Sequence, residues 1–176
     1  MGCWKPWRLA PLCALVVTAG LSACVPDSQP DNQFLTELER LTAKEDIRNL
    51  LLDYGRHLDS RDFEAYSQLF AADGEWIGGF GTVSGPAAIQ IFMEDAIPGP
   101  NTGNTYHLLS NFQIDVRGDE ATASSRWAFV TGGSSDTPTI VQGGRYEDTL
   151  VRENGAWKFS RREALLDIPV SFPPED

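Results

Sequence analysis

Residues 98–116 read PGPNTGNTYHLLSNFQIDV, and at this stretch the spacing of apolar side chains changes from helical to alternating. The beginning, rich in proline and glycine, predicts a turn. The alternation that follows predicts a strand with two faces. We expect Tyr106, Leu108, Phe112, Ile114 and Val116 on one face, and His107, Leu109, Asn111 and Gln113 on the other. Helices are therefore expected before this stretch and a sheet after it.

The segment before the turn carries helical spacing. Thr42-Ala43-Lys44-Glu45 is a capping box, which predicts that a helix begins there. Its inward stripe is expected to hold Ile47, Leu50, Leu51, Tyr54 and Leu58, with Asp59 near the stripe at the end of the helix. A second, short helix is expected from about Asp62, and a third from Pro86, because proline fits the first helical turn.

The segment after the turn predicts an antiparallel sheet. Further strands are expected through Trp127 and Phe129, over 139–152 and over 157–166. Helices followed by such a sheet define an α+β fold. We expect a curved antiparallel sheet, half-covered by three N-terminal helices, that forms a cone with an open end. A cone of this kind can hold a pocket of apolar side chains with a few polar groups.

The N-terminus has the three zones of an export signal. Lys5 and Arg8 give a positive start, residues 9–20 are largely apolar, and Leu21-Ser22-Ala23-Cys24 brings small residues to the cut site. The apolar run is too short for a spanning helix, which needs about 20 residues. The tetrapeptide resembles the bacterial lipobox, in which the cysteine thiolate is alkylated by diacylglycerol before cleavage. The alternative is an ordinary signal peptide with a chance cysteine near its cut site.

Lipid on Cys24 would determine both the compartment and the cysteine chemistry. The expected segments are a signal peptide at 1–23, a polar lipidated tether at 24–33 and one domain at 34–176. Cys3 and Cys13 leave with the signal, so no internal disulfide remains. Val25 does not resemble an inner-membrane retention signal. We therefore expect an exported protein, anchored by lipid to the cell envelope at the outer membrane and facing the periplasm.

The charge restricts the partners. The net charge is −11 at pH 7, and the loss of Lys5 and Arg8 changes it to −13. Such an acidic body argues against nucleic acid and anionic membrane surfaces as partners. It leaves a small hydrophobic molecule open as a ligand.

Familiar cofactor signatures are absent from the sequence. It has no phosphate-binding loop, no dinucleotide glycine fingerprint, no His-Glu-x-x-His motif and no Gly-x-Ser-x-Gly elbow. The chain has only two histidines, which excludes a histidine-rich metal site. Catalysis is therefore expected to need neither cofactor nor metal and to depend on acid/base groups of the chain itself.

Asp59 and His107 are the candidates for that acid/base chemistry. Histidine is the side chain that exchanges protons most readily near neutral pH. If helix and strand meet at the open end of the cone, the carboxylate could hold the imidazole in one tautomer, and His107 would act as a general base. The alternatives are a structural helix-end aspartate and a polar histidine on an edge strand.

Six further residues are candidates for the wall of a ligand pocket: Tyr54, Trp76, Phe80, Asn111, Trp127 and Arg162. Tyr54 is either a hydroxyl donor or a core residue, and the aromatic rings fit a wall as well as a core. Asn111 could bind a ligand or satisfy backbone groups. Arg161 and Arg162 alternate, so one is expected to point inward, where an ion pair with a carboxylate is the alternative to a ligand contact.

Several of these segments resemble the SnoaL-like families, which share the cone-shaped fold of nuclear transport factor 2. The resemblance runs from about Leu41 to Leu166. It is carried by Asp59, His107, Asp73-Gly74-Glu75-Trp76, Gly81-Thr82-Val83-Ser84-Gly85 and Asn154-Gly155-Ala156-Trp157-Lys158-Phe159. It is closest to the branch that contains scytalone dehydratase and lindane dehydrochlorinase.

The resemblance implies that Asp59 and His107 are a catalytic pair and that two copies can form a homodimer. One departure is that no second histidine follows Trp127, which argues against dehydration of scytalone itself. Two functions remain open. The first is a cofactor-independent lyase or isomerase that removes a proton from a small hydrophobic substrate. The second is a non-catalytic envelope module that binds a hydrophobic ligand or a protein partner in the same cone.

Overall fold

The structure is a computed structural model that describes residues 1–2, 32–132 and 137–168. The expected signal peptide, the lipidated Cys24 and most of the tether lie outside these residues. The chain divides after Asp31, and the compact unit begins at Asn32. None of the described helices is both long and apolar enough to cross a membrane.

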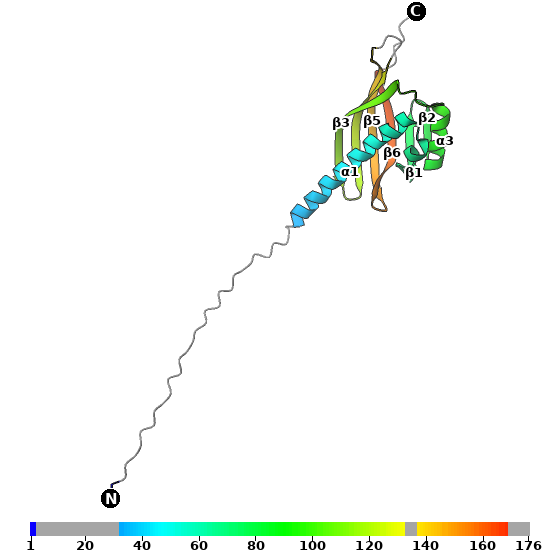
Figure 1. Cartoon of the computed structure of the whole chain (residues 1–176). Helices are drawn as coiled ribbons and strands as arrows, with labels where there is room; N and C mark the ends of the chain where they lie inside the picture. The colour runs from blue at the N-terminus through cyan, green and yellow to red at the C-terminus, as the bar shows by residue number, and fades with distance from the viewer. Residues whose placement is uncertain (3–31, 133–136, 169–176) are drawn as a thin grey trace, which may run out of the picture. The chain divides into compact units, whose positions relative to one another are not determined.

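The compact unit contains three helices and six strands among its described residues (Figure 1). In chain order these are α1 (Asn32–Ser60), α2 (Phe63–Ser67), β1 (Phe70–Gly78), β2 (Gly81–Ser84), α3 (Pro86–Ala96), β3 (Thr105–Arg117), β4 (Glu120–Thr131), β5 (Thr139–Glu153) and β6 (Ala156–Ile168). The α+β class is therefore confirmed. The last two strands also begin and end within two residues of their expected positions, and β4 contains Trp127 and Phe129.

The strands form one curved sheet in the order β2-β1-β6-β5-β4-β3. All neighbours are antiparallel except β1 and β6, which run parallel. The expectation of a purely antiparallel sheet was wrong at this pair. The β1–β2 hairpin was also not expected, because its sequence (FAADGEWIG) has no regular apolar alternation.

Helix α1 lies across one face of the sheet and packs against β3 and β6 (Figure 1). Its inward stripe is as expected, with Ile47, Leu51, Tyr54 and Leu58 almost fully buried against Phe159 and other core residues. The predicted start of the helix was wrong, however, because α1 begins at Asn32, ten residues before Thr42. Good helix formers fill residues 35–41 (LTELERL), so the capping box lies inside the helix.

A bulge in β3 reverses the two faces of that strand. The register with β4 shifts between Ser110 and Gln113, and Asn111 has φ 54°. Since one extra residue moves every following side chain to the other face, His107 shares the inner face with Phe112. Tyr106 and Leu108 are exposed instead. The predicted faces were therefore wrong for residues 106–111.

Candidate functional site

A cavity of about 300 Å³ opens between the sheet and the helices. It is lined by Tyr54, Leu58, Tyr66, Trp76, Gly79, Phe80, Met93, Ile97, His107, Trp127, Gln142, Tyr146, Ala164 and Leu166. Most of these side chains are apolar, and the polar ones are a histidine, three tyrosines and one glutamine. This composition and size are typical of sites for small organic ligands.

Asp59 and His107 form a two-point contact at the edge of the cavity. Asp59 Oδ1 lies 2.7 Å from His107 Nδ1, and Asp59 Oδ2 accepts a hydrogen bond of 2.9 Å from the backbone N–H of His107. Both side chains are mostly buried, with 23% of Asp59 and 14% of His107 exposed. The end of α1 and the beginning of β3 therefore meet, which is the condition that the sequence set for an Asp59–His107 pair.

The contact determines the tautomer of the imidazole. An ionised carboxylate can only accept hydrogen bonds, so Nδ1 carries the proton and donates to Asp59. Nε2 is then the nitrogen with a free lone pair, and the His107 side chain lines the cavity. The rings of Phe129 and Trp127, with centroids 5.0 and 6.3 Å from that of His107, limit its rotation. The pair can thus accept a proton from a molecule in the cavity.

Asn101 ties the turn before β3 to the end of α1. Its side-chain amide donates hydrogen bonds to the backbone carbonyls of Asp59 (2.5 Å) and Thr105 (3.1 Å), and its Oδ1 accepts one from Gly103 N–H (2.9 Å). The sequence predicts only a turn at residues 98–101. The position of Asn101 just ahead of the strand bearing His107 was the signal for this role.

Three tyrosines form a cluster in the cavity wall. The Tyr54 ring centroid lies 4.7 Å from that of Tyr66 and 5.4 Å from that of Tyr146, and the Tyr54 hydroxyl accepts a hydrogen bond of 3.1 Å from Trp76 Nε1. Burial raises the pKa of Tyr66 and Tyr146 well above that of free tyrosine. These phenols therefore stay protonated and can donate hydrogen bonds to a ligand.

Arg162 lies behind this cluster and does not line the cavity. Its guanidinium carbon is 3.7 Å from the Tyr54 ring centroid, 3.9 Å from that of Tyr146 and 4.5 Å from that of Phe159. The side chain is fully buried. The expected ligand contact was wrong because two aromatic rings that line the cavity separate the guanidinium from it.

Asp148 is the carboxylate next to Arg162. An ion pair of this kind is the alternative to a ligand contact that the sequence offered for that arginine. The two residues are register partners on β5 and β6, with Arg162 Nε 3.6 Å from Asp148 Oδ1. Neither side chain has a hydrogen-bond partner among the described residues. Burial raises the pKa of Asp148 to about 6, although the nearby Arg162 opposes this shift.

Asn111, like Arg162, is an expected pocket residue that does not line the cavity. It sits in the bulge of β3 and is exposed. By contrast, Tyr54, Trp76, Phe80 and Trp127 all line the cavity. Tyr66, Tyr146 and Gln142 were missed. Tyr66 and Tyr146 fall on apolar stripes, so the sequence predicts them as core residues. Gln142 lies beside a second bulge, so the face of the strand on which it lies could not be predicted from alternation.

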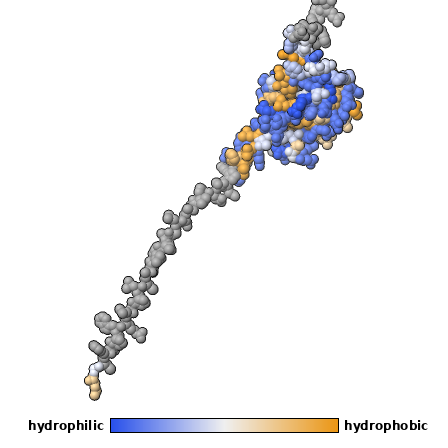
Figure 2. Space-filling view, in the orientation of Figure 1, coloured by the Kyte–Doolittle hydropathy of each residue, from blue (hydrophilic) through white to orange (hydrophobic). Residues whose placement is uncertain are grey.

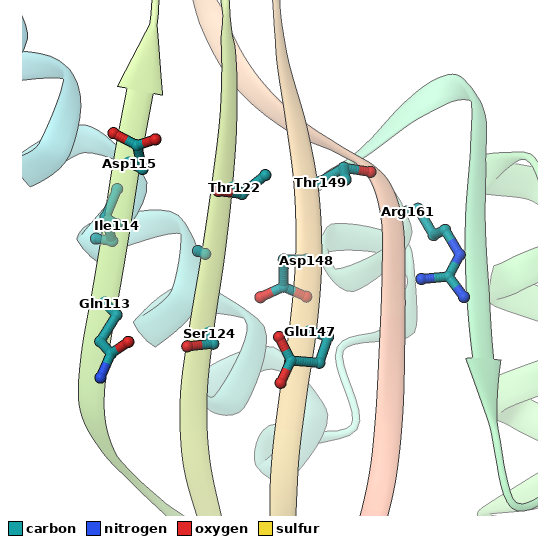
Figure 3. A pocket seen from close by; sticks show the side chains of 10 residues that line it. Gln113, Ile114, Asp115, Thr122, Ser124, Glu147, Asp148, Thr149 and Arg161 are labelled. Carbon is teal, nitrogen blue, oxygen red and sulfur yellow. The ribbon is translucent and has the colours of Figure 1, made fainter.

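A larger groove of about 460 Å³ lies on the other face of the sheet (Figure 3). It is open and polar, and its charged side chains already have partners. Asp115 pairs with Arg117, Glu147 with Arg145, Arg161 with Glu163, and the buried Asp148 with Arg162. These pairs leave no unpaired charge to bind a ligand. Nor, in the described parts of the chain, do three His, Cys, Asp or Glu side chains cluster as metal ligands would.

Comparisons with known proteins agree with this geometry. A model of the SnoaL-like domain matches residues 39–163. The gamma-hexachlorocyclohexane dehydrochlorinase of Sphingobium indicum is 24% identical over 135 residues, which cover 76% of this chain and 86% of the relative.

Two solved structures from Novosphingobium aromaticivorans are also similar. One is a protein like nuclear transport factor 2 with a cystatin-like fold, 33% identical, with a TM-score of 0.67 over 79% of this chain and 92% of that one. The other is a protein assigned to the scytalone dehydratases, 28% identical, with a TM-score of 0.57 over 77% of this chain and 87% of that one. The relatives thus include lyase-type enzymes that eliminate hydrogen chloride or water.

Proposed function

The chain belongs to the SnoaL-like family, and on that premise we propose that it is a cofactor-independent lyase that removes a proton from a small hydrophobic substrate. The observation that carries the proposal is the contact between Asp59 Oδ1 and His107 Nδ1 at the edge of a largely apolar cavity. A carboxylate held against an imidazole in this way suits the imidazole to general-base catalysis.

The proposed step is a β-elimination. Nε2 of His107 takes a proton from a carbon of the substrate, and the electrons of that C–H bond form a double bond to the neighbouring carbon. The leaving group departs from the neighbouring carbon with its bonding pair, as chloride or, after protonation, as water. Asp59 stabilises the imidazolium that forms, and the proton later returns to solvent.

Donors in the cavity wall support this step. The Trp127 Nε1–H and the Tyr66 hydroxyl are buried and have no hydrogen-bond partner among the described residues. An orphaned buried donor is costly unless a ligand satisfies it. We assign these groups to the leaving group, or to a carbonyl next to the acidic carbon, because both carry developing negative charge.

The apolar lining limits the chemical class of substrate that the cavity can bind. Leu58, Met93, Ile97 and Leu166 offer no hydrogen bond, and among the described residues no ionised carboxylate or ammonium group lines the cavity. An ionic substrate would lose its hydration without compensation there. The substrate class is therefore a neutral, compact ring or chain with one leaving group. A purely binding role is not favoured, because the relatives described above include a dehydrochlorinase and a protein assigned to the scytalone dehydratases.

We also propose that the mature protein is tethered to a membrane through lipid on Cys24. The support is the sequence Leu21-Ser22-Ala23-Cys24 after a charged and apolar leader. The compact unit begins at Asn32, so the tether would be short. A site without cofactor suits the periplasm, where nucleotide cofactors are scarce.

The test compares the two histidines of the chain. His107→Gln and His57→Gln remove one imidazole each, but His57 lies outside the cavity lining. Purified proteins are incubated in deuterated water with a panel of chlorinated cyclohexanes and cyclic β-hydroxy ketones. Mass spectrometry then measures alkene formation and deuterium at the acidic carbon.

We expect turnover of at least one panel class by the parent and by His57→Gln, and a loss of roughly 10²–10⁴-fold in His107→Gln. Binding is followed separately through the fluorescence of Trp76 and Trp127, which line the cavity. Full turnover by a folded His107→Gln protein would refute the mechanism. Quenching by panel compounds without turnover in any class would favour the binding module instead.

A further inference from the structure

The beginning of α1 carries an apolar stripe that none of the described residues covers. We call residues 32–41 the arm, because this part of α1 projects past the sheet (Figure 1). Its large apolar side chains are all exposed: Phe34 62%, Leu35 40%, Leu38 50% and Leu41 51%. Figure 2 shows the corresponding orange patch on the arm. Three of the four lie at positions i, i+4 and i+7, so they form one stripe.

The stripe faces away from the sheet. The other side of the arm, with Thr36, Glu39 and Arg40, lines a shallow depression against the turn between β3 and β4. Leu38 lies two residues from Thr36, which on a helix is a rotation of about 200°. The polar side therefore faces the domain and the apolar side faces outward. The core cannot account for this stripe.

We propose that the arm docks on the lipid bilayer, with its apolar stripe in the boundary between headgroups and acyl chains. The inference rests on the proposed lipid anchor. Seven residues, 25–31, separate Cys24 from the start of α1. Even a fully extended segment of this length spans only about 25 Å. The stripe is therefore held close to the bilayer, which raises its effective concentration at the lipid surface.

The charges of the arm define the kind of lipid surface. Its one basic residue, Arg40, pairs with Glu37, and Glu39 adds a further negative charge. The arm therefore has no basic cluster that could attract anionic headgroups, and insertion depends on the apolar stripe alone. We expect docking to be stronger on zwitterionic phosphatidylethanolamine and phosphatidylcholine than on phosphatidylglycerol, which repels the acidic domain.

The experiment places one fluorescent label on either side of the arm. The full chain is produced in a bacterium, purified from membranes and reconstituted in phosphatidylcholine vesicles, with Leu38→Cys or Thr36→Cys as its reactive thiol. A polarity-sensitive fluorophore reports the environment, and vesicles with brominated acyl chains quench only labels that reach the bilayer. Because both positions are exposed, the substitutions preserve the core.

We expect a blue shift and strong quenching by brominated lipid at position 38, and neither at position 36. Equal exposure of both labels to water would overturn the proposal. A label at position 38 that is shielded at high protein concentration but not quenched by lipid would also overturn it, in favour of a second copy of the chain.

The lipid anchor is tested separately. The mass of the purified chain before labelling reports the acyl groups on Cys24. If the acyl groups are absent, the anchor is refuted. The quenching of the labels on the arm is then measured in a Cys24→Ser background with added vesicles. Quenching at position 38 then still supports docking by the arm, and its absence overturns it.

Discussion

The carboxylate of Asp59 holds His107 at two points, with one oxygen 2.7 Å from the ring nitrogen Nδ1 and the other 2.9 Å from the backbone N–H of the same residue. The two residues are 48 positions apart in the chain. A ring contact alone would leave the strand free to slide relative to the helix. The second contact fixes the backbone as well, so the direction of Nε2 follows from the fold.

Replacement of Asp59 by asparagine should reverse the tautomer of His107. The amide can still accept the backbone hydrogen bond through its oxygen, but its NH₂ then faces Nδ1 as a donor. Nε2 becomes protonated and is no longer a base. We expect kcat of the elimination to fall by roughly 10²–10⁴-fold with little change in KM. Steady-state kinetics on the Asp59→Asn protein measure this effect.

A matched substitution controls for structural damage at this site. Asp62→Asn removes a nearby carboxylate that caps α2 and has no contact with His107. It should lower stability slightly and leave kcat unchanged. Equal kcat values for Asp59→Asn and the parent protein would argue against the proposed role of the pair.

Asp148 should make stability depend on pH. Its pKa is raised to about 6 in the folded protein from an ordinary value of 3.8, because burial disfavours the ionised carboxylate. The stabilising contribution of this group is therefore complete below about pH 4 and is lost as the pH rises through 6. In Asp148→Asn this loss is absent. Compared with the parent, the variant should gain unfolding free energy between pH 4 and pH 7.5, by up to about 3 kcal/mol.

Urea unfolding of both proteins at the two pH values measures the difference. Asp167→Asn is a suitable control, because that carboxylate is more exposed and pairs with Arg126 and Arg145 on the surface. A constant difference between Asp148→Asn and the parent across this pH range would contradict the assignment of the raised pKa to Asp148.

Asn111 should tolerate glycine and reject a β-branched residue. Its φ of 54° lies in the left-handed region, which costs an ordinary L-residue roughly 1–2 kcal/mol. Asn111→Gly is expected to unfold at nearly the parental denaturant concentration, whereas Asn111→Val should lose at least about 1 kcal/mol. Chemical denaturation followed by tryptophan fluorescence distinguishes them. Equal stability of the two variants would mean that the bulge can move along β3.

Substitution of Gly144 by alanine should lower the stability of the fold far more than the same substitution at Gly55. A Cβ at Gly144 would lie 1.9 Å from the backbone carbonyl oxygen of Leu165 and 2.8 Å from the Trp127 ring. At Gly55 it would meet only the movable end of the Leu109 side chain, at 2.8 Å. Alanine also favours the helix at Gly55 by about 0.5–1 kcal/mol, which offsets the crowding.

We therefore expect Gly55→Ala to be nearly neutral and Gly144→Ala to lose about 3 kcal/mol or more. Thermal unfolding of the two variants tests the contrast, and cavity binding by Gly144→Ala should weaken because Trp127 is displaced. Similar melting temperatures for both variants would contradict the close packing at Gly144.

Much of this arrangement follows from local patterns in the sequence. The inward stripe of α1, ending at Leu58 and Asp59, and the strand that begins before His107 are both visible as apolar periodicity. The bulge at Asn111 is not, because periodicity assumes an uninterrupted strand and one extra residue exchanges the faces. This is why the sequence predicted the strand that carries His107 but assigned the wrong faces to residues 106–111 and placed Asn111 in the pocket.

Other features depend on pairing between distant segments. Arg162 meets Asp148 only because β6 pairs with β5 in one particular register. The β1–β2 hairpin becomes part of the sheet only through its parallel contact with β6. Local spacing carries no information about register between segments that are far apart in the chain. Tyr66 and Tyr146 were missed for a related reason, since a buried phenol and a cavity-lining phenol have the same spacing in the sequence.

The strand order has a consequence for how the protein is made. The last strand, β6, lies between β1 and β5, so the β1–β2 hairpin and the β5-β4-β3 sheet cannot join before residues 156–168 have been synthesised. Until then both parts have unpaired edges that invite association with other chains. Completion of the fold is therefore delayed until β6 has been synthesised. A chain that crosses a membrane before it folds would benefit from this delay, and a truncated chain without β6 should aggregate.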